Sequence, residues 1–201
     1  MEIANLIVKL DDLKTRQSQL NSCWGKTGNR DFLEFMTELL PMALHAERCS
    51  IFISNPEDNS AWIQCGTGIS EKQIKVPREN SVVGEVIATG MKVIDYDLDR
   101  RIGAHDLIAL KTGFTAYNTL CVPIFGRSTH AVAGAIQLLN KTPEGAHFTD
   151  GDIALAGRLA RHMHINIENI FLGQQMADTI TEMGSKIESI EDYLLDHGVP
   201  L

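Results

Sequence analysis

Residues 112–152 read TGFTAYNTLCVPIFGRSTHAVAGAIQLLNKTPEGAHFTDGD, and this stretch decides the fold expected for the chain. It holds two apolar runs, Thr119–Phe125 and Ala131–Leu139, separated by a short polar turn that begins at Gly126. Short runs rich in Val, Ile and Leu between turn residues are typical of buried strands. Two such runs across a short loop predict an antiparallel hairpin at the centre of a sheet.

A long helix is expected directly after this hairpin, with Thr149 as its N-cap. Asp152, three residues later, completes a motif that resembles a capping box, with Asp in the place of the usual Glu. Phe148 before the cap and Ile153 after it can form a hydrophobic staple. The sequence therefore predicts a firm start to this helix.

Upstream of the hairpin the pattern predicts short strands and helices. A helix from Asn29 should bury the apolar side chains Phe32, Phe35, Met36, Leu39, Leu40 and Leu44. It is followed by two strands, a short helix that ends at Gly90, and a short strand, at Arg48–Ser54, Ala61–Cys65, Val82–Thr89 and Met91–Ile94. The segment Asp95–Lys111 is the least regular. The order predicts an α/β (α+β) domain with a central antiparallel sheet and helices on one face.

Both ends of the chain carry apolar heptad patterns. Near the N-terminus these are Ile3, Leu6, Leu10, Leu13 and Leu20, and near the C-terminus Met176, Ile180, Met183, Ile187, Ile190 and Leu194. One helix cannot bury such a seam alone, so a homodimer is expected, joined by a coiled coil or four-helix bundle. The alternative is that the two ends pack only on each other within one chain. The expected segments are a dimerisation helix and linker at 1–28, a globular domain at 29–171 and a coiled-coil helix at 172–201.

Composition excludes several classes of function. The net charge is −8 and Lys and Arg do not cluster, which disfavours nucleic-acid binding. No apolar run reaches the roughly 18 residues of a membrane span, and the N-terminus lacks a signal-peptide pattern, so a cytoplasmic location is expected. The four cysteines have neither the spacing of a zinc site nor the setting of a disulfide framework.

Catalytic and metal motifs are not found either. The chain has no GxSxG, HExxH or P-loop sequence, so no catalytic residue is expected. His162 and His164 lie two apart on a predicted helix and face different sides. The acidic run Asp95, Asp97 and Asp99 could hold a cation, but it lacks the spacing of a calcium loop, and a solvated loop is favoured. No metal site is expected.

Taken together, the motifs resemble a GAF domain over about residues 29–171. The resemblance is carried by two groups of residues: Gly113, Phe114, Asn118, Leu120, Cys121, Pro123 and Ile124, and then Asn140, Lys141, Phe148 and Asp152. The pattern is most similar to the GAF domains of cyclic-nucleotide phosphodiesterases and certain bacterial adenylyl cyclases. In the second group the family's final Glu is replaced by Ile153.

This resemblance implies a regulatory module that binds a small ligand, such as cAMP or cGMP, between the sheet and Asp95–Lys111. It implies no cofactor beyond such a nucleotide. Modules of this kind usually stand upstream of an output domain, and the sequence leaves open whether such a domain follows. The ligand contacts expected on this basis are Ser50, Cys65, Asp95, Asp97, His105, Thr112, Thr115 and Gln137.

The second motif also suggests a structural latch made of Asn140, Lys141, Phe148 and Asp152. Lys141 can pair with Asp152 across the loop and hold the last helix against the hairpin, near the positive end of the helix dipole. Two alternatives to the sensor remain open. One is a GAF domain that only dimerises, without a ligand. The other is a GAF-type methionine sulfoxide reductase, which carries catalytic thiols in the segment where Asp95–Lys111 has no cysteine.

Overall fold

The computed structural model describes residues 12, 15, 29–55, 60–67, 74–77, 79–100, 113–126, 131–196 and 198. The dimerisation helix and linker expected at 1–28 lie almost wholly outside these residues. The chain divides into two compact units, one formed by Asn29–Asn169 and the other by Met1–Gly28 together with Ile170–Leu201. No helix of the described part combines the length and apolarity that a membrane span requires.

The larger unit is built on a six-stranded sheet in the order β3-β2-β1-β6-β5-β4, in which every neighbouring pair is antiparallel. The strands are β1 (Ala46–Asn55), β2 (Ser60–Gly66), β3 (Lys75–Pro77), β4 (Val93–Asp95), β5 (Thr119–Phe125) and β6 (Val132–Lys141). The predicted α/β fold class and the β5–β6 hairpin are confirmed. The edge strand at residues 75–77 was not among the predicted strands.

The helices are α2 (Asn29–Leu44), α3 (Val82–Thr89) and α5 (Asp150–Asp196), with a short 3-10 turn, η1, at Leu98–Arg100. The bounds of α3 are those predicted, because both caps are local. The Ser81 hydroxyl accepts a hydrogen bond from the Gly84 amide at 2.9 Å, and Gly90 closes the helix at a φ of 67°. The capping box of α5 is also present, since the Thr149 amide donates to the Asp152 carboxylate at 2.7 Å.

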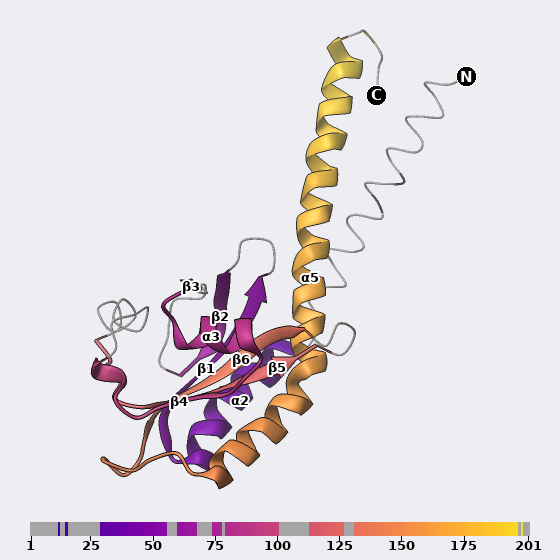
Figure 1. Cartoon of the computed structure of the whole chain (residues 1–201). Helices are drawn as coiled ribbons and strands as arrows, with labels where there is room; N and C mark the ends of the chain where they lie inside the picture. Colours follow the sequence, from indigo (N-terminus) through magenta and orange to yellow (C-terminus); the bar gives the residue numbers. More distant parts are fainter. Residues whose placement is uncertain are drawn as a thin grey trace. The chain divides into compact units, whose positions relative to one another are not determined.

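Helices cover both faces of the sheet, which corrects the expectation that they lie on one face (Figure 1). A Cβ on Gly134 of β6 would point at Ile167 of α5, while the next residue, Ala135, belongs to the apolar core under α3. Successive strand residues point to opposite faces, so α3 and the first half of α5 lie on opposite sides. α2 lies on the side of α5 (Figure 1).

The buried face of α2 is rotated from the one expected. Leu33, Met36 and Leu40 are buried, whereas Phe35 is 56% exposed and Leu39 lies at the surface. The expected face and the observed face both repeat with the period of a helix, so the local sequence pattern could not show which one is buried. The choice follows from packing against β1.

The second half of α5 belongs to the smaller unit, and only some residues of its predicted heptad seam are buried. Ile180, Ile187 and Leu194, spaced by seven residues, are buried. Met183 and Ile190, which alternate with them, are 37% and 42% exposed. One half of the predicted seam is thus buried within a single chain, and the other half is open.

Candidate functional site

The candidate site lies on the α3 face of the sheet, where the two central strands meet. Ser50 of β1 is in register with Gln137 of β6, and Gln137 is in register with Cys121 of β5. Directly opposed residues of antiparallel strands point to the same face. Because Cys121 belongs to the core under α3, Ser50 and Gln137 face that side too. The structure therefore brings together two of the residues predicted as ligand contacts.

Ser50 and Gln137 are both buried, with exposed fractions of 6% and 8%. Within the described residues, neither the Ser50 hydroxyl nor the Gln137 amide has a hydrogen-bond partner. The nearby Thr119 is different, since its buried hydroxyl donates to the Leu138 carbonyl at 2.9 Å. A buried polar group without a partner costs about 1–3 kcal/mol of stability. A ligand that offered a donor and an acceptor to Gln137 would remove this cost.

A stack of an arginine on an aromatic ring lies next to Ser50 and Gln137. The Arg48 guanidinium carbon lies 3.8 Å from the centre of the Phe114 ring. Arg48 precedes Ser50 by two residues on β1 and therefore lies on the same face. The stack places a delocalised positive charge beside Ser50 and Gln137. The sequence alone did not indicate Arg48, although alternation along β1 from Ser50 could have found it.

Cys65, also expected as a ligand contact, lies on the other face. A bulge in the β1–β2 pairing between Ile51 and Phe52 puts Cys65 in register with Ile51. Ile51 and Ser50 are neighbours on β1 and point to opposite faces. Cys65 is thus separated from Gln137 by the thickness of the sheet.

The two fully buried cysteines are poor nucleophiles. Burial raises the pKa of the Cys49 thiol, and proximity to Cys65 and Cys121 raises it further. Burial also raises the pKa of Cys121, with a smaller contribution from Glu85. The thiolate is the reactive form of cysteine, so burial keeps both residues in the unreactive form at neutral pH.

The remaining predicted contacts are dispersed or lie outside the described residues. Asp95 accepts a hydrogen bond from the Asp97 amide at 3.0 Å, which is a local turn, and Asp97 is exposed. Thr115 is exposed as well. His105 and Thr112 fall outside the described part of the chain. Within that part, no group of three or more His, Cys, Asp or Glu side chains could hold a metal ion.

The Lys141–Asp152 ion pair suggested by the sequence is present and well shielded. Lys141 Nζ lies 2.8 Å from Asp152 Oδ1, and the two side chains are 10% and 13% exposed. The same ammonium donates to the Leu44 carbonyl at the end of α2, also at 2.8 Å. Phe148 is buried beneath it, with the ammonium 5.7 Å from the ring centre. One charge thus ties together β6, α2 and the start of α5.

The surroundings of Asp152 favour its charged form. Partial burial raises its pKa, but hydrogen bonds from Lys141 and Thr149 outweigh that effect and lower the pKa below the usual range. The carboxylate is therefore an acceptor at neutral pH.

Asn140 joins the end of β6 to the segment that leads into β5. Its backbone is left-handed, with a φ of 57°. Its side-chain oxygen accepts from the Tyr117 amide at 2.7 Å, and its nitrogen donates to the Thr115 carbonyl at 2.9 Å and to Glu47 at 2.8 Å. Because this segment also carries Phe114, the latch is connected to the Arg48–Phe114 stack beside Gln137.

Comparison with known proteins agrees with this architecture. The family model described as GAF domain matches residues 30–167. The GAF domain of a phosphoenolpyruvate-protein phosphotransferase from Coxiella burnetii superposes with a TM-score of 0.62 at 17% identity, covering 83% of this chain and 98% of that one. The corresponding Acinetobacter domain gives a TM-score of 0.58 at 18% identity, covering 82% and 95%.

An enzyme shares the fold as well. Free methionine-R-sulfoxide reductase from Neisseria meningitidis superposes with a TM-score of 0.55 at 18% identity, covering 84% of this chain and 93% of that one. At such identities the superpositions establish the fold and leave the chemistry to the residues of the site.

Proposed function

The chain belongs to the GAF domain family, and from this premise we propose that it is a regulatory module that senses a small ligand and is not an enzyme. The proposal rests on one observation: Gln137 and Ser50 are buried opposite each other on the α3 face without hydrogen-bond partners among the described residues. A folded chain keeps such a costly pair where function requires it. The buried state of Cys49 and Cys121 speaks against the reductase alternative.

The ligand class we propose is a small molecule with a planar edge that carries both a donor and an acceptor, with cAMP and cGMP as the first candidates. A carboxamide such as Gln137 can meet a base edge with two hydrogen bonds. The structures named above are two GAF domains of phosphotransferases and one methionine sulfoxide reductase, so the cyclic-nucleotide type stays a proposal. His105 and Thr112, which are outside the described residues, remain candidate contacts in addition to Ser50 and Gln137.

Gln137→Leu separates ligand binding from stability. Removing an unpartnered buried amide is expected to raise the free energy of unfolding of the ligand-free protein by about 1 kcal/mol. The same change should abolish the rise in melting temperature that cAMP or cGMP gives to the wild type. Thermal and urea unfolding, with and without millimolar nucleotide, measure both effects.

Thr119→Val is the matched control on the next strand. Its hydroxyl is buried but bonded to the Leu138 carbonyl, so its loss should destabilise the protein by about 1 kcal/mol. If Gln137→Leu were as destabilising as Thr119→Val, the proposed role of the amide would be wrong. If neither nucleotide shifted the wild type at millimolar concentration, cyclic nucleotides would be excluded and another ligand of the same class required.

We also propose that the signal leaves through α5 and that two chains pair through its second half. Leu172, Met183 and Ile190 are 50%, 37% and 42% exposed in a single chain. They lie in steps of 11 and 7 residues, each close to a whole number of helical turns, so they line one side of the helix. A second copy would cover this stripe, and the shielded Lys141–Asp152 pair connects the sheet to the same helix.

Light scattering is expected to give the mass of two chains for the wild type. Met183→Glu with Ile190→Glu should reduce it to one chain, because a charge in the seam opposes its burial. Glu188→Lys, exposed on another side of the helix, should leave the dimer intact. A wild-type mass of one chain would instead support the alternative in which the two ends pack only on each other.

A further inference from the structure

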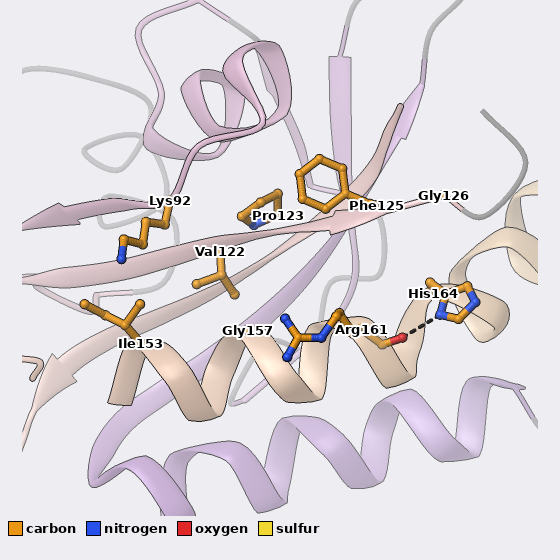
Figure 2. A pocket seen from close by; sticks show the side chains of 9 residues that line it. All are labelled: Lys92, Val122, Pro123, Phe125, Gly126, Ile153, Gly157, Arg161 and His164. Atoms are coloured by element: carbon orange, nitrogen blue, oxygen red, sulfur yellow. Dashed lines mark hydrogen bonds between the residues drawn. The ribbon is translucent and has the colours of Figure 1, made fainter. Parts of the chain in front are cut away.

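A groove lies between β5 and the first half of α5, on the side of the sheet opposite Gln137 (Figure 2). β4 pairs only with Thr119–Cys121, so the end of β5 extends past it as a sheet edge. The groove has a volume of about 610 Å³ and follows the free edge of β5. Val122 and Ile153 line it on the α5 side, whereas the side chains of Pro123 and Phe125 lie on the other side of the strand (Figure 2). This volume falls within the range of about 300–1,000 Å³ that is usual for small-molecule sites.

The groove also carries two positively charged side chains. Lys92 and Arg161 both line the groove, and none of the described residues that line it is acidic. Neither cation has an ion-pair partner within the described residues. Figure 2 shows the Arg161 guanidinium directed back along α5 toward Gly157. In a chain with a net charge of −8, an unpaired cationic site of this kind favours an anionic ligand.

His164 is positioned by its own helix. Its Nδ1 lies 2.5 Å from the Arg161 carbonyl oxygen, to which it donates a hydrogen bond. The other ring nitrogen, Nε2, remains for a contact at the end of the groove.

Gly157 is the second observation that points to a ligand. Glycine is among the weakest helix formers, and inside α5 it lowers helix stability relative to alanine. A Cβ at this position would meet nothing within 4 Å, so no contact in the described chain requires glycine here. Its missing side chain instead leaves the helix backbone open to a body lying in the groove.

We propose that this groove binds a small amphipathic anion. The apolar body would lie against Val122, Ile153 and the Gly157 backbone, and a carboxylate, sulfonate or phosphate group would be attracted by the positive charges of Lys92 and Arg161, which lie at different points along the groove (Figure 2). Pro123 has no backbone N–H, so the addition of a peptide strand at this edge is disfavoured. The part of the groove between Val122 and α5 lies on the opposite face of the sheet from Ser50 and Gln137, and a ligand bound there would contact α5 directly.

The test uses two fluorescent probes of nearly the same shape. Anilinonaphthalene sulfonate carries the anionic group, and phenylnaphthylamine is its neutral parent. The sulfonate is expected to bind at least about tenfold more tightly, because charge-assisted hydrogen bonds add to the apolar contact. The double variant Lys92→Gln with Arg161→Gln should remove this difference and leave the neutral probe unaffected.

Gly157→Phe should abolish binding of both probes by filling the groove, whereas Gly157→Ala, which adds one methyl group against the ligand, should weaken binding only in part. Gln137→Leu should not change probe binding, so failure here is distinguishable from failure of the sensor proposal. Equal affinity of the two probes for the wild type, or unchanged binding by a folded Gly157→Phe, would overturn the proposal. If Gly157→Phe does not fold, the double charge variant decides, because both of its side chains are exposed.

Discussion

Replacing Lys141 by methionine is expected to lower the free energy of unfolding by about 3 kcal/mol, as is usual when one partner of a buried ion pair is removed. Methionine fills similar space but leaves the Asp152 carboxylate and the Leu44 carbonyl without the ammonium that now contacts both at 2.8 Å. Both charged side chains are shielded, at 10% and 13% exposure. Urea unfolding at neutral pH measures the loss.

The pH dependence of this loss in stability tests whether it arises from the charged Asp152 carboxylate. Because the folded protein lowers the pKa of Asp152, its stabilising contribution is fully present above the unfolded pKa, about 3.9. The contribution is lost as the pH falls through the folded pKa. The difference between wild type and Lys141→Met should therefore be largest at neutral pH and shrink below about pH 4.

Lys186→Met is the matched control. Lys186 contacts Glu182 at 2.6 Å, a shorter distance than in the buried pair, but the two side chains are 72% and 67% exposed. Solvent screens such pairs, so no measurable change in stability is expected. Equal losses from the two substitutions would show that shielding does not strengthen the Lys141–Asp152 pair.

Gly134→Ala should be the most disruptive single methyl group in the sheet. A Cβ at this position would lie 2.3 Å from the Phe52 carbonyl oxygen and 3.6 Å from Ile167. The first neighbour is backbone, so the central strands β1 and β6 must separate to admit it. We expect a loss of about 3 kcal/mol or more in the free energy of unfolding, at the upper end for overpacking.

Gly157→Ala makes the same change where there is room. A Cβ there meets nothing within 4 Å, and alanine is the better helix former, so a gain of about 0.5–1 kcal/mol is expected. Chemical denaturation of the two variants side by side tests the contrast. A stable Gly134→Ala protein with wild-type pairing of β1 and β6 would contradict the close approach.

Several elements were determined by sequence alone, because their causes are local. Turn residues bound the strand Thr119–Phe125, a serine cap and a glycine define α3, and Thr149 with Asp152 starts α5. Each of these interactions joins residues a few positions apart, and only the native backbone conformation satisfies them. The family motif also placed Lys141 and Asp152 on either side of one short loop. Their pairing joins residues only 11 positions apart, so it too could be expected from the sequence.

Only the tertiary structure decided which of the predicted site residues meet. Ser50 and Gln137 are far apart in the chain and become neighbours because β6 pairs with β1 as well as β5. One bulge moved Cys65 to the opposite face, since shifting the register by a single residue reverses where every side chain points. The rotation of α2 and the covering of both sheet faces also depend on contacts between segments far apart in the chain. A repeating apolar pattern shows that a face is buried, but the packing of distant segments selects the partner that buries it.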